Sequence, residues 1–132
     1  MRGKIFLATC IALTVTAADA RRFGDPLTAR PISATEFEVI HERFTTNRDV
    51  WCAAGEFARD QLGLGRARLY LTAGKSPATT LPGQQSYKFT TEAIPEAFQS
   101  YSVIINRAGA NMSVGAARNT CYQPYELDRT RN

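Results

Sequence analysis

The alternation of apolar and polar residues along the chain predicts one long helix and several strands. Residues 35–42, TEFEVIHE, place Phe37, Val39 and His41 on one side, which is typical of a half-buried strand. The other side carries three glutamates and one isoleucine: Glu36, Glu38, Ile40 and Glu42. We therefore expect the glutamates to face solvent, with Ile40 as the one exception to the pattern.

The long helix is expected to follow this strand and to run to about Leu62. Thr46 and Asp49 have the spacing of a capping box at its start, and Gly63 is suited to a left-handed C-cap. At about 100° per residue, the apolar side chains that share one side of this helix are Val50, Trp51, Ala54, Phe57, Ala58 and Leu62. Cys52 falls outside this arc, so it is placed to meet a segment that crosses the outer flank of the helix.

Downstream of the helix, the pattern predicts four more strands. The first alternates most clearly, and the third is a continuous apolar run that is typical of a central strand. These strands are residues 66–74, 86–91, 101–109 and 111–122. Residues 75–85 are rich in proline, glycine, serine and threonine and are expected to form a long loop, and residues 94–100 a single helical turn.

This order of elements predicts a small single domain of the α+β class. We expect an antiparallel sheet of about four to five strands with one long helix packed on one face. The domain is expected to span residues 35–125, between an extended lead-in at 21–34 and a disordered tail at 126–132. A chain of 132 residues has room for one hydrophobic core of this kind.

The first 20 residues have the three parts of a secretory signal peptide. A basic start, MRGK, precedes the uncharged apolar residues 5–17, and the sequence ADA supplies the small residues of a cleavage site. The apolar stretch is shorter than the about 20 residues that a transmembrane helix needs. A lipoprotein cleavage box at residues 7–10 is the alternative, but it leaves too few apolar residues before the cut. We expect an exported protein, periplasmic or secreted, with no transmembrane segment.

Two cysteines, Cys52 and Cys121, remain once residues 1–20 are removed. An even number of cysteines in an exported chain usually forms disulfides, so we expect these two to be bonded to each other. The bond would close a loop of roughly 70 residues. By lowering the entropy of the unfolded chain, it would stabilise the fold by roughly 4 kcal/mol. It should hold residues 120–122 against the outer flank of the helix.

An enzymatic alternative rests on the same part of the chain. A thiol near a helix N-terminus can be an activated nucleophile, and His41, the only histidine, is a conceivable partner for Cys52. Glu36, Glu38 and Glu42 could instead supply a carboxylate pair for glycan hydrolysis. Either arrangement would make the protein a small secreted hydrolase. Because the disulfide is the expected state of Cys52, we assign no catalytic residue.

Cofactor and metal motifs are not evident in the sequence. The AGKS stretch at residues 73–76 lacks the first glycine of a phosphate-binding loop. The histidine, the cysteines and the carboxylates show no spacing typical of metal ligands, and no C-x-x-C-H haem motif occurs. We therefore expect neither a metal nor a cofactor.

The basic residues suggest a binding surface. The formal net charge is +4 for the whole chain and +3 without residues 1–20, which permits contact with anionic partners without requiring it. The side chains expected to form this surface are Arg66, Arg68 and Tyr70 on one strand face, Lys88 on a neighbouring strand, and Lys75 in the loop. We expect an acidic protein or an anionic envelope component as the partner, and no nucleic acid. The sequence thus predicts an envelope accessory protein or inhibitor that acts by binding, without catalysis.

Overall fold

The computed structural model describes residues 27–99 and 103–122. The expected signal peptide at residues 1–20 and the expected tail at 126–132 lie outside these ranges, as does the first part of the lead-in. The described part of the lead-in contains a short strand, β1 (Ala29–Pro31).

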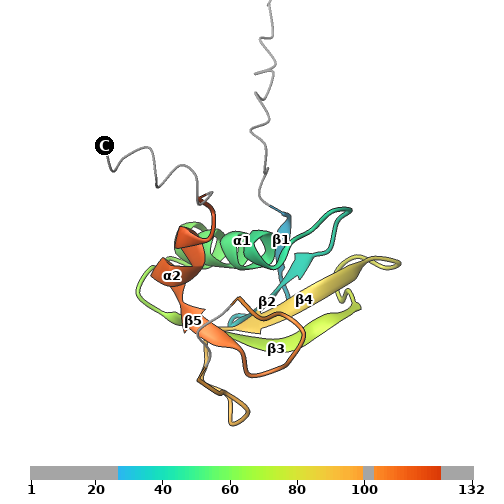
Figure 1. Cartoon of the computed structure of the whole chain (residues 1–132). Coiled ribbons are helices and arrows are strands. Elements are labelled where there is room, and N and C mark those ends of the chain that lie inside the picture. Colours follow the sequence, from blue (N-terminus) through green and yellow to red (C-terminus); the bar gives the residue numbers. More distant parts are fainter. Residues whose placement is uncertain (1–26, 100–102, 123–132) are drawn as a thin grey trace, which may run out of the picture.

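The sheet has five antiparallel strands in the order β1-β2-β4-β3-β5. The other four strands are β2 (Glu36–Ile40), β3 (Arg68–Pro77), β4 (Gln85–Thr90) and β5 (Asn111–Ser113). The helix α1 (Asn47–Asp60) lies across one face of this sheet (Figure 1). The predicted α+β architecture with one long helix is therefore confirmed.

Helix α1 begins where its capping residues predict. Asp49 N–H donates to Thr46 Oγ1, and the Asp49 carboxylate accepts from Thr46 N–H at 2.9 Å, so the capping box is complete. The helix ends at Asp60, two residues before the predicted end, and Gly63 follows with a φ of +68°. The buried residues of α1 are Val50, Trp51, Ala53, Ala54, Gly55 and Ala58.

Aromatic rings dominate the contact between α1 and the sheet. The Trp51 ring meets Phe89 of β4 edge to face at 5.1 Å, and the Phe37 ring lies 4.7 Å from Phe57. Trp51, Phe37 and Phe89 are fully buried. The side of β2 that the alternation assigned to the core therefore does face the helix.

The apolar run at residues 101–109 is not a strand, so that prediction is wrong where the structure describes the run, at 103–109. Ile105 is buried and Val103 and Ile104 pack against the core without a regular ladder. The indole N–H of Trp51 donates to the Ile104 carbonyl oxygen at 3.2 Å. Core packing and this side-chain hydrogen bond thus hold most of the run, and at its end Gly109 N–H donates to the Leu71 carbonyl oxygen of β3 at 2.8 Å.

The predicted strand at residues 111–122 is also corrected. Only β5 is extended, and α2 (Val114–Asn119) follows it directly. The Ser113 hydroxyl accepts from Ala116 N–H and caps α2, and Val114 and Ala117 are buried at helical spacing. The apolar residues here alternate as in a strand, but they also fit helical spacing, and the Ser113 cap favours the helix.

Helices α1 and α2 pack closely at a glycine and are joined by the disulfide. A Cβ added to Gly55 would lie 2.9 Å from Ala117 Cβ and 2.9 Å from Arg118 N, so the glycine allows the approach. Cys52 and Cys121 form the predicted bond, with their Cα atoms 4.8 Å apart. The Thr120 hydroxyl also donates to the Arg48 carbonyl oxygen at 3.0 Å.

Replacing Gly55 by alanine tests this close approach. Alanine normally stabilises a helix interior relative to glycine, but here its methyl group would push α2 away from α1. We expect Gly55→Ala to lower the free energy of unfolding by about 1–3 kcal/mol in urea denaturation. Gly65→Ala is the matched control, because a Cβ there meets only Arg59 Cγ at 3.8 Å. Equal stability of the two variants would contradict the packing described.

Candidate functional site

The disulfide removes Cys52 from the list of available reactive groups. Its Sγ atom is bonded to Cys121 Sγ at 2.06 Å, and the Glu56 carboxylate lies 3.5 Å from Cys121 Sγ. These three residues are close enough to hold a metal ion, but both sulfur atoms are already bonded to each other. His41 contacts Tyr87 instead of Cys52. The structure therefore does not assemble the cysteine–histidine pair considered from the sequence.

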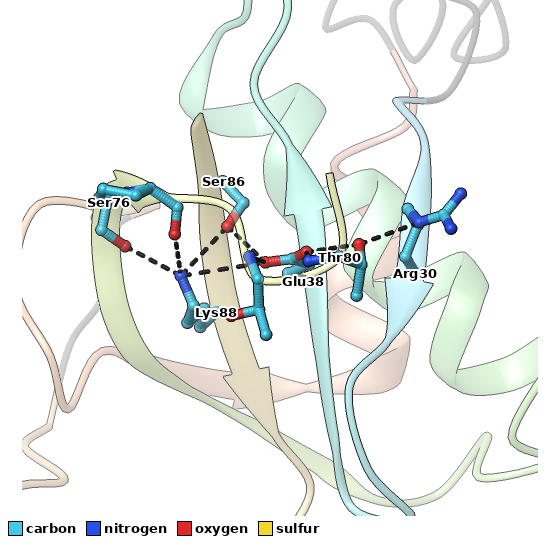
Figure 2. A network of polar contacts seen from close by, with 8 residues as sticks. Arg30, Glu38, Ser76, Thr80, Ser86 and Lys88 are labelled. Carbon is cyan, nitrogen blue, oxygen red and sulfur yellow. Dashed lines mark hydrogen bonds and ion pairs between the residues drawn. The ribbon is translucent and has the colours of Figure 1, made fainter. Parts of the chain in front are cut away.

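Glu38, which was expected to face solvent, is fully buried on the face of the sheet opposite α1. The loop at residues 78–84 folds over this face, and the Glu38 carboxylate accepts hydrogen bonds from it (Figure 2). The donors are Thr79 N–H at 2.9 Å, Thr80 N–H at 2.7 Å, the Thr80 hydroxyl at 2.6 Å and the Ser86 hydroxyl at 2.7 Å. Lys88 Nζ lies 3.9 Å from the same carboxylate.

These contacts make Glu38 a structural anion. Burial by itself raises the pKa of this carboxyl, but the hydrogen bonds from Thr80, Thr79 and Ser86 together outweigh it and lower the pKa to about 2. A carboxylate that stays ionised and fully hydrogen-bonded is poorly suited to act as a general acid. Glu36 and Glu42, its proposed partners in glycan hydrolysis, are exposed.

The residues predicted to form one basic surface are distributed over different parts of the domain. Arg66 lies in the turn before β3, and Arg68 donates through Nε to the Asn111 side-chain oxygen at 2.6 Å. Tyr70 follows on β3 and is half-buried. Lys88 points into the Glu38 network, where it donates to the Pro77 carbonyl oxygen at 2.8 Å (Figure 2). Binding at this surface stays a prediction.

Lys75 lies on β3 and not in a loop, because β3 extends to Pro77 and β4 begins at Gln85. It lines a cleft of about 540 Å³, which the sequence reasoning did not identify. The residues that line this cleft are Ala73, Gly74, Lys75, Ser76, Tyr87, Ile105 and Asn106. The cleft therefore lies between the distal part of β3, β4 and the segment that was predicted to be a central strand.

An irregularity in β3 lies beside this cleft. The pairing of β3 with β4 shifts register between Leu71 and Ala73 and again between Ala73 and Ser76. Such bulges redirect side chains and are common beside functional sites. Gly74 permits the close approach of the opposite wall, because a Cβ there would lie 2.8 Å from the Ile105 carbonyl oxygen.

His41 and Tyr87 lie together beside Lys75. His41 Nδ1 and the Tyr87 hydroxyl are 3.1 Å apart and share a hydrogen bond. Burial lowers the pKa of His41, and the positive charge of Lys75 lowers it further. Burial raises the pKa of the Tyr87 phenol. Both groups are therefore neutral near about pH 7, and Lys75 supplies the positive charge of the cleft.

A second feature that sequence reasoning missed is Phe44, in the connection between β2 and α1. Its side chain is 87% exposed, and its φ of +66° makes it the only non-glycine residue with positive φ in the described ranges. Thr45 N–H donates to the Glu42 carbonyl oxygen, and Glu42 N–H donates to the Thr45 hydroxyl at 2.9 Å, so the turn is held in place. In the sequence, the only sign of this feature was an aromatic residue within the polar stretch HERFTTN.

Phe44 and the Lys75 cleft lie at the same end of the sheet. His41 N–H donates to the Gln85 carbonyl oxygen, which joins the end of β2 to the start of β4. The β2–α1 connection and the β3–β4 hairpin extend from this end, as Figure 1 shows. The Arg43 guanidinium lies 5.4 Å from the centre of the Phe44 ring and adds a second cation here.

Comparisons with protein-family models, with curated proteins and with solved structures give no match to this chain, so its function is inferred from the geometry alone. Within residues 27–99 and 103–122, no helix is long and apolar enough to cross a membrane.

Replacing Glu38 by glutamine tests the buried network. The pKa of Glu38 is about 2 in the folded protein against an ordinary value of 4.5, so its ionised form stabilises the fold above about pH 4.5 by roughly 3 kcal/mol. This contribution declines as the pH falls from 4.5 towards 2. In urea unfolding, Glu38→Gln should be less stable than wild type at about pH 7, with a smaller difference at about pH 3.

Glu36→Gln is the control for this measurement, because Glu36 is on the same strand and is exposed. It should change stability by less than about 0.5 kcal/mol at any pH. A stability difference between Glu38→Gln and wild type that does not change with pH would contradict the role given to the ionised carboxylate.

Proposed function

We propose that this chain is an exported protein that acts by binding a partner that carries carboxylates, without catalysis of its own. Its partner is an acidic protein, which fits the role of an inhibitor or envelope accessory protein. The observation that carries the proposal is Phe44, a strained and exposed aromatic residue beside Arg43. The cystine is compatible with export to an oxidising compartment.

The environments of the reactive groups favour binding over the hydrolase alternative. Cys52 is in a disulfide, and the Glu38 carboxylate accepts hydrogen bonds from three residues of the loop and of β4. A thiol hydrolase needs a free Cys52 thiol, and a glycosidase needs a carboxyl group that can gain and lose a proton.

Phe44 contributes little to the packing of the domain and is held in an unfavourable backbone conformation. A left-handed conformation costs a residue with a side chain roughly 1–2 kcal/mol, and bulky residues adopt it rarely. Strain of this kind concentrates at functional positions. Aromatic residues and arginine are also the side chains that most often dominate binding energy at protein interfaces.

A protein partner explains this turn better than a lipid surface does. One exposed aromatic side chain and one adjacent arginine supply little membrane affinity, because stable anchoring to a bilayer usually needs two strong signals. A pocket on a protein can enclose the Phe44 ring while carboxylates at its rim contact Arg43. The expected partner therefore has an apolar socket with an acidic rim.

The first test uses stability and needs no partner. Asparagine adopts positive φ more readily than phenylalanine, so Phe44→Asn should raise the free energy of unfolding by about 0.5–1 kcal/mol. Thermal and urea unfolding measure this effect. A destabilised Phe44→Asn variant would show that Phe44 is kept for folding, and the proposal would lose its main support.

The second test places a photo-crosslinking phenylalanine analogue at position 44 in cells that export the chain. We expect one dominant protein adduct that is lost when Arg43→Glu reverses the neighbouring charge. The same analogue at Arg59, on the exposed side of α1, is the control and should not give this adduct. An adduct that forms equally from both positions, or that persists with Arg43→Glu, would count against an acidic socket.

A further inference from the structure

We propose that the Lys75 cleft is a binding site for a monocarboxylate with a compact apolar body. The carboxylate contacts Lys75 and the Tyr87 hydroxyl, and the apolar part lies against Ala73 and Ile105. This inference goes beyond the proposed function, because it assigns a second site, apart from Phe44 and Arg43, and names the chemical group that this site recognises.

The charge of the cleft fits a single negative charge. Lys75 is exposed, and no carboxylate of the described residues forms an ion pair with it. Lys75 and Tyr87 line the same cleft, and the positive charge of Lys75 lowers the pKa of His41, the hydrogen-bond partner of Tyr87. One ammonium group suits a monoanion, whereas phosphate sites usually combine several cations or backbone N–H groups.

The shape of the cleft fits a small organic ligand. Its volume of about 540 Å³ lies within the range of small-molecule sites, and its walls combine apolar side chains with a few polar groups. The wall that contains Ile105 is held by the Trp51–Ile104 hydrogen bond, and the opposite wall by the pairing of β3 with β4. Fixed walls lower the cost of ordering the site when a ligand binds.

Tyr87 and His41 supply a hydrogen-bond donor that can be directed at the ligand. Neutral imidazole carries its proton on either Nδ1 or Nε2. When Nδ1 carries it, His41 donates to the Tyr87 oxygen, and the phenol O–H is free to donate to a carboxylate. Ligand binding therefore selects the Nδ1–H tautomer of His41 and completes a short chain of hydrogen bonds from His41 through Tyr87 to the carboxylate.

The test is an NMR titration of the isotope-labelled chain with its cystine intact. The probes are acetate, 4-methylpentanoate and the neutral 4-methylpentanamide, at constant ionic strength. We expect saturable shifts of the Gly74 and Asn106 amides and of the His41 ring, which is unambiguous because the chain has one histidine. Affinity should rise by about fourfold for each buried methylene from acetate to 4-methylpentanoate. The amide should not give these shifts.

Two variants test the named contacts. Lys75→Met keeps most of the length of the side chain but removes the charge, and Tyr87→Phe removes only the hydroxyl. Each should weaken 4-methylpentanoate binding by about tenfold or more, and Tyr87→Phe should also abolish the change in His41 tautomer. Arg59→Met is the control, since it removes one exposed positive charge from α1, away from the cleft. It should bind as wild type does.

Several outcomes would overturn the inference. They are the absence of saturable shifts, equal binding of the amide, tighter binding of inorganic phosphate than of 4-methylpentanoate, and unchanged affinity in Lys75→Met. N-acetyl-leucine, which resembles a chain terminus, separates the two sources of the carboxylate. Tighter binding of N-acetyl-leucine than of 4-methylpentanoate supports a protein C-terminus, and the reverse order supports a free acid.

The titration and the crosslinking experiment fail independently. A cleft that binds no carboxylate leaves a charge-dependent adduct at position 44 unaffected, and overturns only the site at Lys75. Carboxylate binding without any such adduct leaves the cleft in place and overturns the acidic protein partner. The two results together therefore show which of the two statements is at fault.

Discussion

The disulfide between Cys52 and Cys121 is the constraint on which the arrangement of the C-terminal part of the domain depends. It joins residues 69 positions apart in sequence and fixes the end of α2 to the flank of α1. Since β5 leads directly into α2, the same bond limits how far the edge strand can move from β3. Gly55 makes this possible, because a larger residue would keep α2 at a greater distance.

A second constraint acts on the opposite face of the sheet. There the buried carboxylate of Glu38 holds the β3–β4 loop by hydrogen bonds and so shields the face that α1 leaves uncovered. Two groups that could have performed catalysis, Cys52 and Glu38, therefore have structural roles. Phe44, Arg43 and Lys75, by contrast, are exposed at one end of the sheet.

Local signals predicted the parts of the structure that depend on neighbouring residues. The capping box, the helix, the strand alternation at 86–91 and the cysteine pairing follow from short-range spacing or from a count that allows one pairing. The burial of Glu38 could not be predicted in this way, because its donors lie 41 to 48 residues away. The apolar run ending at residue 109 has the composition of a strand. Its contacts with the core, including the hydrogen bond from Trp51, show that it fills the core without pairing as a regular strand.

The candidate cleft was missed for the same reason. Lys75, Tyr87 and Ile105 are separated in sequence, and they line one cleft beside a register shift in β3. The alternation of Met112, Val114 and Ala116 suggested a strand, but the Ser113 side chain caps α2, and Val114 and Ala117 are buried at helical spacing. Phe44 could be seen in the sequence as an aromatic residue in a polar stretch, but its positive φ is shown only by the backbone of the structure.

The role of Cys52 is tested most directly by intact mass spectrometry with a thiol-alkylating reagent on protein from an exporting host. We expect no labelling before reduction, a mass lower by two hydrogen atoms than that of the dithiol, and labelling of both Cys52 and Cys121 after reduction. Stoichiometric labelling of Cys52 without reductant would contradict the structural role of the disulfide. It would favour the thiol hydrolase alternative over the binding protein.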